Sequence, residues 1–161
     1  MIKKFLLPLM IVISLVSCKG KDAFKYSQDF VKEEQAIAPE MMKTETAIAG
    51  FIAKEQFDSV VAVSSRMESR IQESISAFSS KPAPDAKEAE NFKAAGIKYL
   101  NYIKNVYSVY IEYGKASTDD IRNEALVKMQ DLVAKKSTVI SDMQSAQKKF
   151  ANANGFRIEN K

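Results

Sequence analysis

The sequence predicts an all-α fold, a single antiparallel four-helix bundle in up-down-up-down order whose first helix is kinked or broken near Pro39. Four stretches carry apolar residues at intervals of three and four, the spacing of one face of an α-helix. Turn-forming residues separate these stretches, so we expect short connections between neighbouring helices. Apolar and polar residues nowhere alternate between hairpin turns, as they would in a sheet.

The first two stretches predict a helical hairpin. The first covers residues 26–53 and contains Pro39. Because proline lacks a backbone donor and clashes with the carbonyl four residues back, we expect a kink or break after Ala38. The second covers residues 57–78, after a short turn at residues 54–56.

The third helix is expected at residues 85–113. Two prolines in the connector at residues 79–84 disfavour helix in the residues before them. Asp85 then has the position of an N-cap, and Glu88 three residues later would complete a capping box. Gly114 lies where a helix of this length would end.

The fourth helix is predicted to be the longest and most regular. Ser117 or Thr118 would cap its start. Gly155 is a plausible left-handed terminator, and Phe156 could fold back onto the last turn. One charged residue, Lys136, interrupts a stripe formed by Leu126, Met129, Val133, Ile140, Met143, Gln147, Phe150 and Asn154.

The first 17 residues have the pattern of a secretion signal. Lys3 and Lys4 precede an apolar run of about 12 residues, well short of the roughly 20 that a membrane-spanning helix needs. The sequence therefore divides into a cleaved signal peptide (1–17), a modified cysteine with a short polar tether (18–25), one helical domain (26–156) and a tail (157–161).

Leu15-Val16-Ser17-Cys18 resembles the lipobox of bacterial lipoproteins. This resemblance implies cleavage before Cys18 and attachment of fatty chains such as palmitate, which would anchor the protein to a membrane. As the only cysteine, Cys18 has no disulfide partner, which leaves a buried free thiol as the other interpretation. Lys19 stands where many enteric lipoproteins carry an acidic residue for inner-membrane retention, so the motif implies the outer membrane. Whether the protein faces the periplasm or the cell surface stays open.

The composition argues against an enzyme. The 24 Lys and Arg residues lose Lys3 and Lys4 with the signal, against 20 acidic residues, so the mature side-chain charge is only +2. The sequence has no basic cluster with interleaved aromatic residues, so we expect no binding to nucleic acid. Histidine is absent, which removes the bases and ligands of serine triads, Glu-x-x-His di-iron sites and covalent haem attachment. We therefore expect no catalytic residues and no cofactor.

Two acidic pairs are the nearest candidates for metal ligands. Glu33-Glu34 and Asp119-Asp120 are adjacent residues, which point about 100° apart on a helix and do not converge on one ion. Solvated helix surface explains the first pair, and the helix dipole explains the second. No metal site is expected.

The third helix carries a face rich in tyrosine, which is the best feature for a binding hypothesis. Tyrosines can line a groove or fill a bundle core with their hydroxyls at its edge, and both interpretations stay open. A filled core favours a module acting through contacts with an unknown protein partner; a groove favours a small-molecule-binding bundle. The candidate binding face consists of Tyr99, Tyr102, Tyr110 and Tyr113.

The C-terminal half carries a family resemblance. Its motif is Gln147-x-x-Phe150-Ala151-x-x-x-Gly155-Phe156-x-Ile158, together with Tyr107, Tyr110 and the Ser117-Thr118-Asp119-Asp120 start of the last helix. Over residues 90–160 the chain resembles a family of small, all-helical, lipobox-bearing surface lipoproteins of Gram-negative bacteria. The resemblance implies location and fold, and it transfers no activity, cofactor or catalytic residue.

Overall fold

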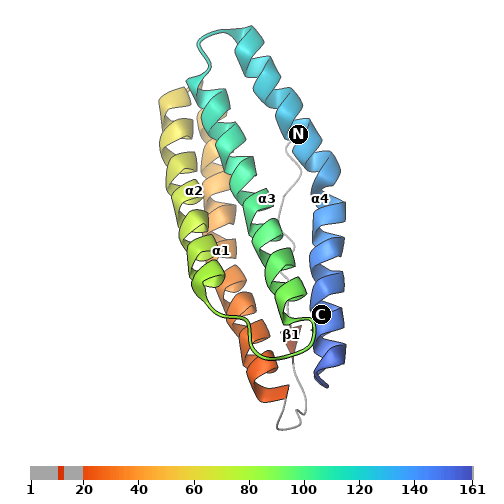
Figure 1. Cartoon of the computed structure of the whole chain (residues 1–161). Coiled ribbons are helices and arrows are strands. Elements are labelled where there is room, and N and C mark those ends of the chain that lie inside the picture. Colours follow the sequence, from red (N-terminus) through yellow and green to blue (C-terminus); the bar gives the residue numbers. More distant parts are fainter. Residues whose placement is uncertain (1–10, 13–19, 161) are drawn as a thin grey trace.

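The computed structural model describes residues 11–12 and 20–160, and four helices make up nearly all of this part (Figure 1). The prediction of an all-helical domain is confirmed, because these helices pack on one another around a common apolar core. They are α1 (Lys21–Ile52), α2 (Phe57–Ser80), α3 (Ala89–Lys115) and α4 (Asp119–Ala153).

Two very short strands accompany the helices. β1 (Ile11–Val12) pairs antiparallel with β2 (Glu159–Asn160), with Ile11 opposite Asn160. The sequence predicted no strand, and two residues are too few for the alternation that would have indicated one.

Helix α3 holds the four helices together. It packs along α2 on one side and along α4 on the other, while α1 packs mainly along α2. By contrast, α1 and α4 touch each other at only a few places. In Figure 1, α4 accordingly lies on one side of α3, and α1 and α2 lie on the other.

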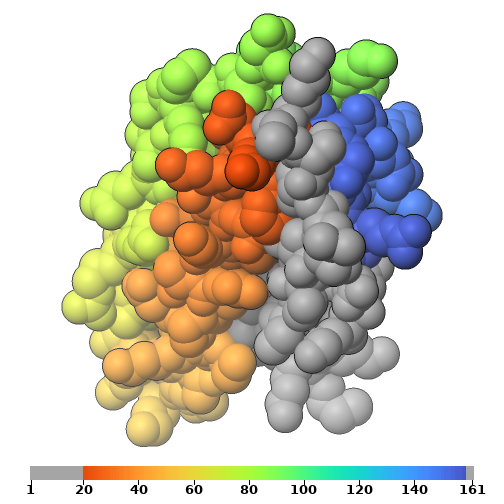
Figure 2. Space-filling model, turned by 90° about the horizontal axis from the view of Figure 1, so that it is seen from below, coloured from red at the N-terminus to blue at the C-terminus, as the bar shows by residue number. Residues whose placement is uncertain are grey.

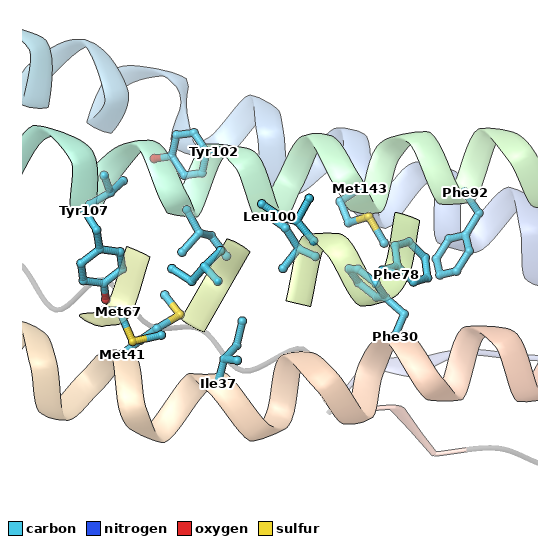
Figure 3. Close-up of a cluster of buried hydrophobic side chains, with 14 of the residues drawn as sticks. Phe30, Ile37, Met41, Met67, Phe78, Phe92, Leu100, Tyr102, Tyr107 and Met143 are labelled. Carbon is cyan, nitrogen blue, oxygen red and sulfur yellow. The ribbon is translucent and has the colours of Figure 1, made fainter. Parts of the chain in front are cut away.

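One end of the core is rich in phenylalanine. The rings of Phe92 and Phe150 stack 5.0 Å apart, and those of Phe30 and Phe78 lie 4.9 Å apart. Figure 3 shows Phe30, Phe78 and Phe92 gathered at this end. Gly96 allows this packing, because a Cβ at this position would lie 2.8 Å from the Phe78 ring. The start of α1, the α2–α3 connector and the end of α4 all reach this end of the molecule (Figure 2).

The structure corrects two expectations for α1. The predicted break at Pro39 does not occur, because one helix runs from Lys21 to Ile52 through this proline, and the predicted kink stays a prediction. Pro39 lies on the exposed side, while buried Ile37 and Met41 hold the helix to the core before and after it. The expected tether is also shorter, since residues 21–25 are already helical and Ala23 is buried.

The capping box predicted for α3 does not form. Asp85 lies in the connector, and Glu88 itself is the N-cap, in the left-handed conformation with φ 63°. Asn91 donates a hydrogen bond to the Glu88 carboxylate. At the other end α3 continues past Gly114, whose missing side chain lets α3 approach Val61 of α2 closely.

Both predicted ends of α4 are confirmed. The Thr118 hydroxyl accepts a hydrogen bond from the backbone N–H of Ile121 at 3.3 Å, so Thr118 is the cap. Gly155 has φ +74°, and the ring of Phe156 turns back to lie 5.7 Å from that of Phe150. The predicted apolar stripe is buried only in the second half of the helix, as the exposure of Leu126 shows.

Candidate functional site

A buried carboxylate faces a tyrosine between α1 and α3. Glu34 of α1 is only 8% exposed, and the Tyr99 hydroxyl of α3 donates a hydrogen bond to its Oε1 at 2.9 Å. Its Oε2 accepts no hydrogen bond. Burial raises the pKa of Glu34 to about 7, because the charged form loses water, although the bond from Tyr99 lowers the pKa in part.

A second, partly buried carboxylate, Glu45, lies three helical turns further along α1. Burial raises the pKa of Glu45 to about 7, against the attraction of Lys136 on α4, which lowers it. On α3, burial and the charge of Glu45 raise the pKa of both Tyr107 and Tyr110. Glu45 therefore lies where α1, α3 and α4 face one another.

These groups repeat at equal intervals on the two helices. Glu34 and Glu45 are eleven residues apart, as are Tyr99 and Tyr110, and eleven residues are close to three turns of an α-helix. The Tyr99 hydroxyl donates to Glu34, and the charge of Glu45 acts on Tyr110 one such interval further along. We call the set of Glu34, Glu45, Tyr99, Tyr107 and Tyr110 the tyrosine–carboxylate seam. With their pKa values raised to about 7, Glu34 and Glu45 can each hold a proton near neutral pH.

The four tyrosines predicted as one binding face are not brought together. Tyr99 and Tyr110 belong to the seam, whereas the Tyr102 hydroxyl donates to the backbone carbonyl of Leu132 on α4 at 2.9 Å. Tyr113 lies at the far end of α3, where its ring is 6.0 Å from that of Phe57. In Figure 3, Tyr102 points toward α4, and Tyr107, which is not one of these four, points into the core beside Met41 and Met67.

The interpretation of Glu33-Glu34 as solvated surface is wrong. Glu34 is buried, and Glu33 lies at the α1–α2 contact, where it accepts hydrogen bonds from Ser74 and Arg70. The hydrogen bond from Ser74 is the main reason that the pKa of Glu33 is lowered, despite partial burial. In the sequence, only the equal spacing of Glu34–Glu45 and Tyr99–Tyr110 could have indicated that these residues face one another in the seam.

Three hollows lined entirely by described residues are found, and none of these three is lined by a tyrosine. The largest, about 690 Å³, lies along the second half of α4 next to residues 157–158. The other two, of about 290 and 280 Å³, lie between the end of α3 and the first half of α4. The tyrosine face therefore does not form the wall of a described hollow.

Within residues 11–12 and 20–160, no three acidic or cysteine side chains gather as metal ligands would. None of the helices in that same part has a stretch apolar and long enough to cross a bilayer. Cys18, the predicted lipidation site, lies outside the described residues.

No protein-family model, curated protein or solved structure matches this chain.

Proposed function

We propose that the protein is a non-enzymatic, lipid-anchored component of the bacterial outer membrane that acts through contacts with another protein. In this proposal its body is an antiparallel, up-down-up-down four-helix bundle, fixed to the membrane by fatty chains on Cys18.

The anchor is supported by the start of the chain. Leu15-Val16-Ser17-Cys18 has the lipobox pattern, and only Lys19 and Gly20 separate Cys18 from the first residue of α1. Two extended residues span roughly 7 Å, so a lipidated Cys18 would place the start of α1 at the membrane surface. The first half of α4 would then point away from the membrane (Figure 1).

The observation that carries the contact function is the apolar surface on that first half of α4. Leu126 is 45% exposed and Val133 is 55% exposed, and their separation of seven residues places them on one face of the helix. Exposed apolar groups that gather on one element mark interaction sites. Ile121 and Val127 are also exposed on this half of α4, and Met42 is exposed on α1.

The alternative function, small-molecule binding by the tyrosine-rich face, has less support. Tyr99 bonds to α1, Tyr102 bonds to α4, and Tyr113 packs against Phe57 of α2. These three side chains are thus engaged in holding helices together. The absence of histidine from the sequence supports a non-enzymatic role.

The anchor is tested by treating cells with globomycin, which blocks the lipoprotein signal peptidase. We expect a precursor about 17 residues longer to accumulate, and we expect the Cys18→Ala variant to lose its membrane attachment. An unchanged size with globomycin, together with Cys18→Ala protein still in the membrane fraction, would refute lipidation.

The contact surface is tested by crosslinking in the native envelope followed by mass spectrometry. We expect one protein to be captured by the wild type and lost when Leu126→Lys and Val133→Lys are combined. Thr138→Lys is the matched control, because Thr138 is exposed on another face of α4. Equal capture by all three proteins would contradict the assignment of this surface.

A further inference from the structure

The largest hollow lies at the opposite end of α4 from the exposed apolar side chains. Its volume of about 690 Å³ is within the range of small-molecule sites. Part of its wall is the segment that follows α4, and the rest is α4 itself. Its lining consists of Ser141, Gln144, Ser145, Gln147, Lys148, Ala151, Asn152, Arg157 and Ile158.

The lining is polar and positively charged. Ser141, Gln144, Ser145, Lys148 and Asn152 recur at intervals of one to four residues on one face of α4, and each ends in a hydrogen-bonding group. Lys148 and Arg157 add two positive charges, and the lining contains no acidic residue. The nearby Asp142 is paired with Lys98 of α3 at 2.8 Å. A negatively charged ligand would therefore meet attraction and hydrogen-bond donors.

One lining residue of the hollow, Gln147, carries a buried side-chain donor without an acceptor. Gln147 is 1% exposed, and its side-chain Nε2 donates no hydrogen bond within the protein. Buried amide groups in folded proteins nearly always have a hydrogen-bond partner. A ligand oxygen in the hollow would supply the acceptor that the protein does not.

The fold holds the second wall in place. Gly155 turns the chain back, and Phe156 is buried with its ring 5.7 Å from both Phe24 of α1 and Phe150 of α4. Arg157 follows directly and is thereby held beside α4. The carbonyl of Ala151 at the end of α4 already accepts bonds from the backbone of residues 154 and 156, which reduces its repulsion of an anion.

We propose that this hollow is a binding site for a phosphate group, held by Lys148, Arg157 and the buried amide of Gln147. Arginine binds phosphate oxygens through its fork of N–H donors, and lysine binds them as a point charge. The phosphate belongs either to a soluble phosphate ester or to a lipid headgroup, because the contact with Phe24 places the hollow near the start of α1. The site does not depend on the contact surface proposed above.

The test uses the mature, lipidated protein in neutral detergent micelles. Two probes are titrated separately: inorganic phosphate, and dihexanoyl phosphatidylglycerol below its micelle concentration. Binding is followed by NMR through the side-chain amide signal of Gln147, which is identified by its loss in Gln147→Leu. We expect this signal to shift, and we expect Lys148→Gln and Arg157→Gln each to raise the Kd at least fivefold.

Lys149→Gln is the matched control, because Lys149 is the adjacent lysine, is exposed and does not line the hollow. It should change the Kd less than twofold. Binding of both probes indicates recognition of phosphate itself, and binding of the lipid alone indicates a headgroup site. If Lys149→Gln weakens binding as much as Lys148→Gln, or if neither probe shifts the Gln147 signal, the proposal is overturned.

Discussion

Glu34 shows how far a single residue can depart from its local pattern. Two adjacent glutamates in a chain with alternating charges look like solvated helix surface, and for Glu33 this is half right. Adjacent residues point about 100° apart on a helix, however. When α1 packs against the other helices, Glu34 therefore turns toward the interior and Glu33 does not. Glu33 then meets Arg70, while Glu34 meets only the hydroxyl of Tyr99.

This difference predicts how the free energy of unfolding depends on pH. An acid whose pKa rises from 4.5 to about 7 on folding binds more protons in the folded state between these values. Stability therefore falls as pH rises from about 5 to 7, by at most about 3 kcal/mol for Glu34. Urea unfolding of Glu34→Gln should show a shallower fall over this range and higher stability than wild type at pH 8.

Glu33→Gln is the control for that measurement. Because folding lowers the pKa of Glu33, its charged form stabilises the folded state at every pH above the unfolded pKa. This stabilisation is lost only as the pH falls from the unfolded pKa toward the lower, folded pKa. Between pH 5 and 8 this variant should be uniformly less stable and should keep the wild-type slope. Since Glu45 has a similarly raised pKa, some slope should persist in Glu34→Gln and disappear when Glu45→Gln is added. An unchanged slope in the double variant would contradict the assigned burial.

Two glycines in helices should respond in opposite ways to alanine. A Cβ at Gly96 would lie 2.8 Å from Phe78 and 2.9 Å from Phe30, whereas a Cβ at Gly50 would meet nothing within 4 Å. Gly96→Ala should cost about 1–3 kcal/mol through overpacking, as measured by urea unfolding. Gly50→Ala should add about 0.5–1 kcal/mol, because alanine loses less backbone freedom in a helix. Equal effects at both positions would show that Gly96 is not tightly packed.

At the scale of the helices, the spacing of apolar residues and the capping and turn residues predicted the four helices and both ends of α4. The four apolar stretches are four helices, and the Thr118 cap and Gly155 terminator are both found. The errors occur where tertiary contacts override local preference. Pro39 does not break α1, because buried side chains hold the helix on both sides, and Glu88 displaces Asp85 as the cap of α3.

The sequence offered Ser117 and Thr118 as caps for the start of α4, and the structure assigns this role to Thr118. Thr118→Ala removes the hydroxyl that accepts from the Ile121 N–H, and it should cost about 1 kcal/mol in the free energy of unfolding. Ser117→Ala is the control and should stay within about 0.5 kcal/mol, because Ser117 is exposed one residue before the cap. Thermal unfolding followed by circular dichroism measures both, and the opposite ranking would make Ser117 the cap.

At the scale of the whole molecule, the candidate site was harder to predict than the fold. Each helix face could be assigned from its own sequence, but which faces meet depends on how the helices are arranged around α3. The four tyrosines share a face of α3, yet α1 and α4 flank that face and divide it between them. The hollow beside Arg157 likewise requires the chain to turn at Gly155 and pack Phe156 against α1.

The packing also predicts a gradient of local stability along α4. Near its end, Phe150 is fully buried among aromatic rings, whereas Leu126 and Val133 in the first half are about half exposed. Segments with few buried apolar contacts open at lower free energy than the core. Native-state hydrogen exchange should therefore show faster amide exchange at residues 123–135 than at residues 143–151.

Substitutions should follow the same gradient. Phe150→Ala should lower the free energy of unfolding by about 3–5 kcal/mol, and Leu126→Ala should lower it by less than about 1 kcal/mol. Uniform protection along α4 would contradict this gradient and would mean that another surface covers the first half of α4 in solution. In that case, adding the partner found by crosslinking should not slow amide exchange at residues 123–135 any further.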